Sequence, residues 1–323
     1  MAVIIMKFGG TSVAEPSSRE IILNKIKQEL DAKNNPVVVV SAMGRRGAPY
    51  ATDTLLDMVP GADADLSALI ASCGEIISAC VVANSLKARG IPAKAMTAYT
   101  AGIMAEGPYD AAIPVNVQTA NLEALMKSGL VPIVTGFQGI LPDSTLATLG
   151  RGGSDTTAVA LGAWLHAEYV DIYTDMPGVN MADPRMILDA PMIPFLDYKS
   201  MVRLSAHGNR VLHDVSARIA LEKNVRVRIL STFHDSPGTV IGPYYDEGQP
   251  DFVGAAVKGK DDVTSIVSLV YRTEKGAAGA GKILEQLKAK ANPSDDPAVV
   301  IFDFPKEKVK EALETILAYY LKK

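Results

Sequence analysis

The 323-residue sequence contains only two cysteines, Cys73 and Cys80, which excludes a fold held together by disulfides. The two lie seven residues apart in a predicted helix, too far for a disulfide within it, and we expect both to be buried thiols. The four histidines are scattered, and no Cys/His cluster has the spacing of a zinc site. We therefore expect no structural metal.

The chain also lacks a basic excess and a long hydrophobic run. A formal net charge of -4 leaves no surplus of cations to neutralise a phosphate backbone, which excludes a general nucleic-acid binder. The apolar segment 2–6 is too short for a signal-peptide core, and we expect no membrane-spanning helix and no membrane partner. These absences predict a cytoplasmic protein that acts on small molecules.

What the sequence does contain is a regular alternation of short apolar runs and amphipathic segments. Strands are predicted at Ala2–Phe8, Val37–Ser41, Ala93–Thr97, Val131–Phe137, Tyr169–Thr174 and Val225–Leu230. Helices are predicted from Pro16 onward and at Leu66–Arg89, Thr156–Ala167 and Asn209–Lys223. Such alternation predicts an α/β fold with a mainly parallel sheet that helices cover on both faces.

A polar, turn-rich stretch at residues 243–251 is predicted to be a linker between two domains. The first domain would then cover residues 1–242 and the second residues 252–323. Within the second, the pattern predicts a small β-α-β-α unit, with strands at Val263–Tyr271 and Ala298–Phe304 and helices at Gly281–Ala291 and Lys306–Leu321.

The strongest chemical signal is Lys7-Phe8-Gly9-Gly10-Thr11-Ser12, which follows directly on the first predicted strand. A lysine next to two residues without side chains lets backbone amides approach a phosphate closely. The motif therefore predicts nucleotide chemistry.

A second signal is Gly150-Arg151-Gly152-Gly153-Ser154-Asp155, which leads into an apolar helix. Amide groups at a helix start favour an anion, although an ordinary helix entry capped by Ser154 or Asp155 fits the same residues.

A third motif, Tyr173 to Val179, follows another strand, and Pro177-Gly178 predicts a type II turn. Thr174 and Asp175 offer acceptors to a base or ribose, and Arg185 offers a fork to phosphates. By itself this motif is only a turn.

These motifs, together with Ser41–Gly44, Gly74-Glu75 and Gly136–Gly139, resemble aspartate kinases in order and spacing over residues 3–242. The resemblance implies a three-layer αβα sandwich of the amino-acid kinase fold. It also implies transfer of the γ-phosphoryl group of MgATP to the side-chain carboxylate of L-aspartate, giving 4-phospho-L-aspartate and ADP. That reaction opens the synthesis of lysine, threonine and methionine, and a homodimer is expected.

The resemblance also assigns roles to residues. Lys7 would stabilise the transferring group and Asp155 would hold Lys7 in place. Arg151 would clamp the α-carboxylate of the substrate and Glu75 would meet its ammonium, although Glu75 could also be a solvated helix carboxylate. The full set for substrate is Ser41, Thr52, Glu75, Phe137, Arg151 and Ser154. The set for ATP is Lys7, Gly9, Gly10, Ser12, Thr174, Asp175, Asn180, Arg185 and Arg210.

Two of these positions depart from the family pattern. Asn180 stands where many relatives have tyrosine, and Arg210 where lysine is common. Because arginine lacks the compact ammonium of lysine, ATP affinity or phosphate geometry can differ. Mg²⁺ is expected to be held mainly by ATP oxygens and water, so no protein ligand is assigned to it.

The C-terminal region departs most from the family. Aspartate kinases commonly carry two ACT domains that bind feedback amino acids, whereas residues 252–323 resemble one shortened ACT-like α+β domain. The segment Gly276–Gly281 is expected to be a flexible loop at the effector position. It matches a phosphate-binding P-loop only up to Lys282, because Ile283 replaces the Ser/Thr that holds magnesium.

Two functions of this region remain open: a dimerisation remnant that leaves the enzyme insensitive to lysine and threonine, which we favour, or an effector site across a subunit interface.

Alternative functions include the glutamate 5-, acetylglutamate, carbamate and uridylate kinases of the same fold. A catalytically silent regulatory subunit that senses amino acid or nucleotide is a further alternative. The presence of Lys7, Asp155, Arg151 and Glu75 together favours the enzyme.

Overall fold

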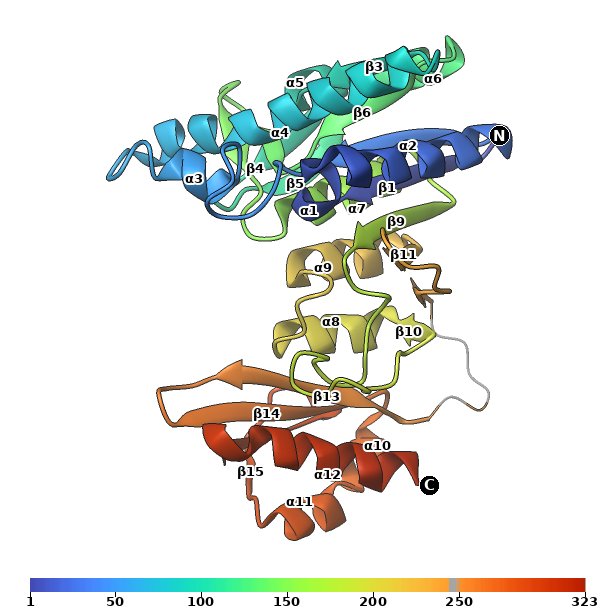
Figure 1. Cartoon of the computed structure of the whole chain (residues 1–323). Coiled ribbons are helices and arrows are strands. Elements are labelled where there is room, and N and C mark those ends of the chain that lie inside the picture. Colours follow the sequence, from blue (N-terminus) through green and yellow to red (C-terminus); the bar gives the residue numbers. More distant parts are fainter. Residues whose placement is uncertain (244–247, 249, 323) are drawn as a thin grey trace. The chain divides into compact units, whose positions relative to one another are not determined.

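The computed structural model describes residues 1–243, 248 and 250–322 (Figure 1). The chain forms two compact units. Unit 1 comprises residues 1–177 and 219–237, and unit 2 comprises residues 178–218 and 238–323. Each unit is described by itself.

Unit 1 contains most of the repeated strand–helix elements. In chain order they are β1 (Val3–Phe8), α1 (Gly10–Ala14), α2 (Pro16–Asp31), β2 (Asn35–Val40), α3 (Thr52–Leu56), α4 (Ala64–Ala88), β3 (Ala93–Met96), α5 (Ala98–Ala101), β4 (Ile103–Glu106), β5 (Ile113–Val117), α6 (Ala120–Lys127), β6 (Val131–Thr135), β7 (Gln138–Ile140), β8 (Leu146–Thr148), α7 (Gly153–Trp164), β9 (Tyr169–Thr174) and β11 (Val227–Ser231).

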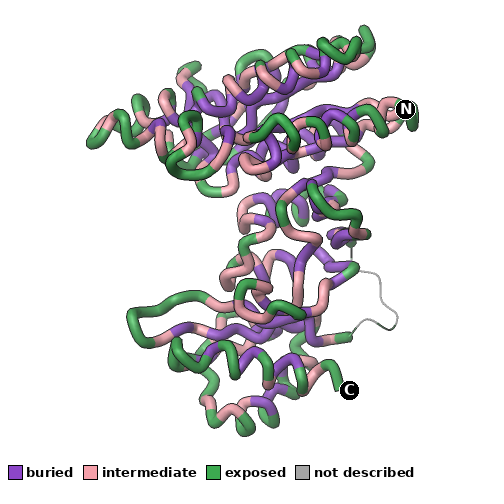
Figure 2. Tube along the Cα trace, viewed as in Figure 1, coloured by how far each residue is buried: buried purple, intermediate pink, exposed green. Residues whose placement is uncertain are grey.

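The central sheet of unit 1 is parallel, with the strand order β11-β9-β1-β2-β6-β3. All six strands predicted within residues 1–242 lie in it. Strand β1 is central, and its Lys7 stands opposite Val39 of β2 and Ile172 of β9. The run Val37–Val40 is fully buried, as expected for a strand covered on both faces. Figure 2 shows the buried segments of each unit in purple. The predicted mainly parallel α/β sheet is confirmed.

Helices cover both faces of this sheet. Ile22 of α2 and Val82 of α4 pack in one apolar cluster with Ile4, Met6 and Phe8 of β1. On the other face lies α7, whose Gly162 approaches Val170 and Ile5 so closely that a Cβ atom would lie 2.3 Å from a Val170 methyl group. Because side chains alternate along a strand, Lys7 points to the face that α7 covers.

A second, smaller sheet of unit 1 was not predicted. It has the order β5-β4-β7-β8 and contains an antiparallel pair at each end. The strand predicted to reach Phe137 ends at Thr135, because Phe137 adopts a left-handed conformation (φ 71°) that breaks the strand. The strands before and after this break, β6 and β7, therefore belong to different sheets.

The described residues of unit 2 form one short parallel pair of strands and one antiparallel sheet. Its elements are β10 (Phe195–Asp197), α8 (Tyr198–Ala206), the first half of α9 (Asp214–Lys223), β12 (Thr239–Gly242), β13 (Phe252–Gly259), β14 (Thr264–Tyr271), α10 (Glu274–Ala278), α11 (Gly281–Leu287), β15 (Ala291–Asn292), β16 (Val299–Pro305), the 3-10 turn η1 (Lys306–Lys308) and α12 (Val309–Leu321). Strands β10 and β12 pair in parallel.

The antiparallel sheet of unit 2 has the order β13-β14-β16-β15, so the predicted β-α-β-α unit is incomplete. Strands β13 and β15 are additional, and β15 was missed because it is only two residues long. The predicted flexible loop Gly276–Gly281 is also wrong in part, since residues to Ala278 form α10. The Thr273 hydroxyl caps that helix by accepting from the N–H of Gly276 at 3.2 Å.

Residues 178–218 pack with the C-terminal strands. The N–H of Ala255 in β13 donates to the carbonyl of Met181 at 2.7 Å, and Ala182 and Ala190 belong to the apolar cluster of the C-terminal sheet. The predicted division into residues 1–242 and 252–323 stays a prediction. Of the predicted linker 243–251, residues 244–247 and 249 lie outside the described residues.

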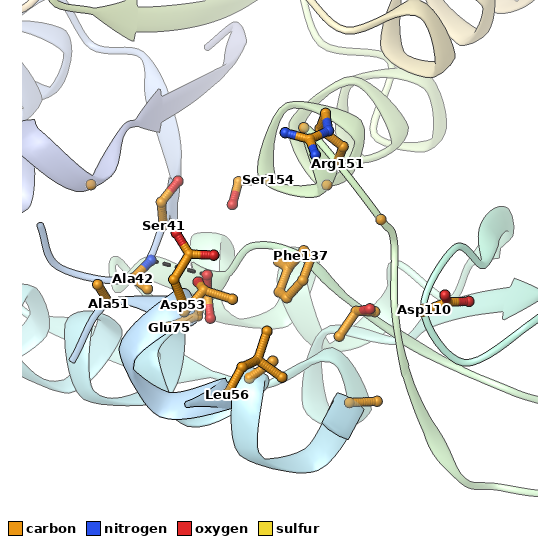
Figure 3. Close-up of a pocket in the computed structure, with 18 of the residues that line it drawn as sticks. Ser41, Ala42, Ala51, Asp53, Leu56, Glu75, Asp110, Phe137, Arg151 and Ser154 are labelled. Carbon is orange, nitrogen blue, oxygen red and sulfur yellow. Dashed lines mark hydrogen bonds between the residues drawn. The ribbon is translucent and has the colours of Figure 1, made fainter. Parts of the chain in front are cut away.

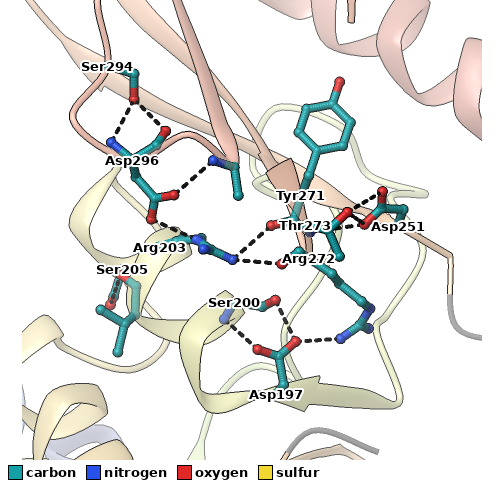
Figure 4. A network of polar contacts seen from close by, with 12 residues as sticks. Asp197, Ser200, Arg203, Ser205, Asp251, Tyr271, Arg272, Thr273, Ser294 and Asp296 are labelled. Carbon is teal, nitrogen blue, oxygen red and sulfur yellow. Dashed lines mark hydrogen bonds and ion pairs between the residues drawn. The ribbon is translucent and has the colours of Figure 1, made fainter. Parts of the chain in front are cut away.

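Ion pairs reinforce this packing inside unit 2 (Figure 4). Asp197, at the end of β10, accepts from the guanidinium of Arg272 at 2.6 Å, and the side chains are only 7% and 4% exposed. Arg203 of α8 pairs with Asp296 at 2.7 Å and donates to the carbonyls of residues 271 and 272. Buried charges are tolerated only when they are paired in this way.

Several local expectations are corrected by the structure. Both cysteines are exposed on α4, not buried. The prediction failed because α4 is apolar on most of its circumference, so the sequence does not reveal which side packs inward.

The 25-residue helix α4 also has the length and mean hydropathy (2.0) of a membrane span. Half of that apolar stretch is buried in the protein, which is equally typical of a core helix.

Two helix starts and one turn also differ. Helix α7 begins at Gly153, before the predicted Thr156, and α9 begins at Asp214, after the predicted Asn209. Gly178 does not have the positive φ that a type II turn requires. Its lack of a side chain serves packing instead, since a Cβ atom would lie 2.7 Å from the sulfur of Met192.

Candidate active site

A cavity of about 810 Å³ lies in unit 1, where the loops after β1 and β2 meet the start of α7 (Figure 3). The eight residues predicted for catalysis and for substrate binding all line it: Lys7, Ser41, Thr52, Glu75, Phe137, Arg151, Ser154 and Asp155. These residues are up to 148 positions apart in the sequence. The geometry therefore brings the whole predicted acceptor site together.

Lys7 and Asp155 form the ionic centre of this cavity. Lys7 Nζ lies 2.7 Å from Asp155 Oδ1, and the side chains are 12% and 13% exposed. Lys7 is fixed by β1 and Asp155 by the first turn of α7, so the ammonium is held between two rigid elements. A cation positioned in this way can stabilise charge that develops on a phosphoryl group.

Glu75 on α4 is a buried carboxyl, only 2% exposed. Its Oε1 accepts a hydrogen bond from the N–H of Ala42 at 3.0 Å, while Oε2 has no hydrogen-bond partner. Burial raises the pKa of Glu75 to about 8, against a smaller lowering by the Ala42 N–H. The alternative of a solvated helix carboxylate is wrong. A buried carboxyl with one oxygen that lacks a hydrogen-bond partner is suited to bind a cation in the cavity.

Arg151 is one of the exposed cations that line the cavity, and it lies across from Glu75 (Figure 3). It lies between Gly150 and Gly152, which both have positive φ (67° and 72°). Gly150 also passes close to Asp110, whose carbonyl would lie 3.2 Å from a Cβ atom. The glycines therefore form the tight turn that presents the guanidinium just before α7 begins.

Phe137 and Ser154 line the cavity from the loop after β6 and from the start of α7. The left-handed Phe137 donates its N–H to the hydroxyl of Thr157 in α7 at 3.0 Å. Gly136 leaves no room for a Cβ atom, which would lie 2.6 Å from Ser154 Oγ. This contact fixes the loop after β6 against the start of α7, and with it the position of both residues.

A smaller cavity of about 220 Å³ lies beside the first, at the ends of β1 and β9. Gly9, Gly10, Thr174 and Asp175, all predicted for ATP, line it together with Lys7. Gly10 is required by a close approach, since a Cβ atom would lie 2.6 Å from the Ala42 carbonyl. A lysine beside glycine backbone fits the anionic oxygens of a phosphate chain.

Other residues predicted for ATP are not among those that line this cavity. Ser12 is fully buried in α1, and its hydroxyl shares a 2.7 Å hydrogen bond with that of Thr232. Asn180, Arg185 and Arg210 belong to unit 2. There, the amide of Asn180 donates to the Ala190 carbonyl at 2.6 Å, and Arg185 pairs with Asp183, whose pKa it lowers. Their role in binding ATP stays a prediction.

Sequence reasoning missed several residues that line the large cavity, among them Arg45, Asp53 and Asp110. Arg45 and Asp53 lie in or just after the loop that follows β2, where the sequence has no periodic pattern. In the part of the chain that the structure describes, no three His, Cys, Asp or Glu side chains are grouped so as to hold a metal ion. A divalent ion here would rely on the oxygens of a bound nucleotide.

Residues 2–231 match the model of the amino acid kinase family. An aspartokinase of Thermus thermophilus is 32% identical over 342 aligned positions, which span 98% of this chain and 81% of that protein. The chain belongs to the aspartokinase family. Aspartokinase 1 of Bacillus subtilis is 38% identical over 249 residues, covering 76% of this chain and 62% of that protein. The chain thus spans about 60% of the length of several curated relatives that it matches.

The family's fold is also found among solved structures. E. coli aspartokinase III, determined in complex with aspartate and ADP, matches with a TM-score of 0.84 at 18% identity, covering 98% of this chain and 99% of that one. At this identity the match shows the fold alone. It agrees with the mixed α/β architecture and the additional antiparallel sheet described above.

Proposed function

We propose that the protein is an aspartate kinase, which transfers the γ-phosphoryl group of MgATP to the side-chain carboxylate of L-aspartate. The new bond joins a carboxylate oxygen to the γ-phosphorus, the bond to the β,γ-bridging oxygen breaks, and its electron pair stays on ADP. The observation that carries the proposal is the buried Glu75, with its unpartnered Oε2, in one cavity with Arg151 and the Lys7–Asp155 pair.

Three ionisable side chains of this cavity have counterparts in the proposed substrates. Glu75 receives the α-ammonium of aspartate and Arg151 binds its α-carboxylate, so the two side chains together select an α-amino acid. Because the acceptor carboxylate, with an ordinary pKa of about 3.9, is already ionised at neutral pH, no general base is needed. Lys7, held by Asp155, stabilises the phosphoryl oxygens during transfer.

Glycine backbone and β9 form the nucleotide side of the site. Gly9 and Gly10 let the nucleotide phosphates approach the main chain, and Thr174 and Asp175 accept hydrogen bonds from its adenosine part. Mg²⁺ neutralises phosphate charge when it is bound with the nucleotide. By this proposal the protein acts in the cytoplasm as a homodimer and opens the synthesis of lysine, threonine and methionine.

Trapping of the acyl phosphate with hydroxylamine tests the proposal. Purified protein with MgATP and L-aspartate should yield aspartyl hydroxamate, while L-glutamate and a reaction without acceptor should not. Hydroxamate from glutamate would indicate another amino-acid kinase. Nucleotide binding without hydroxamate from any acid would instead identify a catalytically silent regulatory subunit.

The role of the C-terminal sheet is tested in the same assay. We propose that residues 252–323 form a shortened ACT-like domain that serves dimerisation and leaves activity insensitive to lysine and threonine. Titration of the active enzyme with either amino acid to millimolar concentration should leave the rate unchanged. Inhibition in that range would show that the domain binds an effector.

A further inference from the structure

The loop between β2 and α3 brings a second cation to the boundary between the two cavities. Among the described residues, Lys7, Gly10, Gly44 and Arg45 line both cavities. Because glycine has no side chain, only the ammonium of Lys7 and the guanidinium of Arg45 project into this shared region. A phosphoryl group that passes from a nucleotide to an acceptor must cross it.

The two cations are held very differently. The partner of Lys7 is Asp155, and both of these side chains are nearly buried. The guanidinium of Arg45 lies 2.7 Å from Asp175, but these side chains are 74% and 45% exposed. An ion pair as exposed as this contributes little to stability, so Arg45 can exchange its partner at little cost.

The loop around Arg45 leaves space for its side chain on one side. Gly44 and Gly47 flank the arginine with positive φ values of 84° and 95°. No atom lies within 4 Å of the position of a Cβ atom on Gly47, so the loop is unconfined on that side. Asp175 is the residue that we expect to accept a hydrogen bond from the nucleotide. Once it does so, its hold on the guanidinium weakens.

We propose that Arg45 is a catalytic residue, whose guanidinium leaves Asp175 and contacts the phosphoryl group in transit. The inference rests on the proposed kinase function. Lys7 supplies a fixed point charge, whereas Arg45 supplies a planar fork that can bind two phosphoryl oxygens at once. Arg45 forms no covalent bond and transfers no proton. Its contribution is charge stabilisation that is stronger in the transition state than in the ground state.

The neighbouring Arg46 provides a matched control. It comes from the same loop, is 70% exposed, and pairs with Asp57 at 2.9 Å. It lines the acceptor cavity but not the nucleotide cavity. Loss of Arg46 therefore removes the same side chain from the same loop without removing a cation from the boundary.

The variants Arg45→Ala and Arg46→Ala should be compared by hydroxamate formation with saturating MgATP. Arg45→Ala should lower kcat by about 100-fold and change the KM for aspartate by less than about threefold, because the guanidinium contacts the phosphoryl group and not the amino acid. The loss in Arg46→Ala should be at least tenfold smaller. Arg45→Lys should recover part of kcat, since it keeps the charge but not the fork.

Calorimetric binding without aspartate gives a readout that does not depend on turnover. In the wild type, the β,γ-imido analogue of ATP should bind more tightly than ADP, and Arg45→Ala should reduce this preference about tenfold. Arg46→Ala should retain it. Equal kcat losses in the two alanine variants, or an unchanged nucleotide preference in Arg45→Ala, would refute the role of Arg45. Absence of hydroxamate with the wild type would refute the proposed function instead.

Discussion

Replacement of Glu75 by glutamine should remove a large pH dependence of stability. The pKa of this buried carboxyl is about 8 in the folded protein, against 4.5 in its unperturbed state. Because the folded state holds the proton more tightly, the stabilisation is fully present below about pH 4.5. It is lost as the pH rises toward 8, when the unfolded chain is already ionised.

The expected size follows from the two pKa values. Each pH unit in this window corresponds to about 1.4 kcal/mol, so the free energy of unfolding should fall by about 3 kcal/mol between pH 5 and pH 8 on account of Glu75 alone. Glutamine has no such titration and still offers an oxygen to the Ala42 N–H. The stability of Glu75→Gln relative to wild type should therefore rise by about 3 kcal/mol across this range.

Urea denaturation at several pH values measures this difference, because it compares two proteins in which all other groups titrate alike. Asp65→Asn is the control for replacing a carboxylate by an amide on α4, because Asp65 is exposed on the same helix. A stability difference between Glu75→Gln and wild type that changes with pH no more than that of Asp65→Asn would refute a strongly raised pKa at position 75.

The same ionisation should couple to binding. If Glu75 meets the ammonium of aspartate, it must release its proton when the ligand binds at pH 7. Calorimetry in buffers of different ionisation enthalpy should detect the release of close to one proton per site in the wild type and none in Glu75→Gln. Aspartate binding to the wild type without proton release would place the ammonium elsewhere.

Three further changes test other parts of the structure. Asp155→Asn should lower kcat about 100-fold, because Lys7 loses the charge that positions it, while the melting temperature stays within a few degrees; a fully active variant would defeat this role. Gly10→Ala should destabilise the fold by about 1–3 kcal/mol in urea denaturation, because its Cβ would lie 2.6 and 2.7 Å from two backbone carbonyl oxygens, and an unchanged midpoint would contradict this packing. Arg272→Met should cost about 3–5 kcal/mol by leaving Asp197 buried without its guanidinium partner, and Asp197→Asn in the same background should restore part of that loss if the unpaired charge is the cause.

The sequence predicted the parallel sheet because its strands are continuous apolar runs. Tyr169–Thr174 was predicted to the residue, and the valines of β2 could hardly belong to a half-exposed strand. Strands such as β7 and β15 have only two or three residues, and pairing with distant partners decides whether they form. Periodicity within a short segment cannot report such pairing.

The candidate site could likewise be predicted only in part from the sequence. Lys7 and Arg151 were found because glycines flank or follow them in patterns that serve phosphate and anion binding. The burial of Glu75, and thus its raised pKa, depends on how α4 packs on residues far away in sequence. Arg45 escaped notice because an arginine in an irregular loop looks like any solvent-exposed charge until the cavities around it are known.

The ion pairs inside unit 2 bear on how genes for such a chain can be recombined. A crossover near residue 243 looks harmless in the sequence, because it falls in a polar stretch between two predicted domains. It would nevertheless separate Asp197 from Arg272 and Arg203 from Asp296, and a foreign tail would have to supply both partners anew. A recombinant that keeps both ion pairs must exchange residues 178–218 together with the C-terminal strands. The segment that has to be inherited as one unit is therefore discontinuous along the gene.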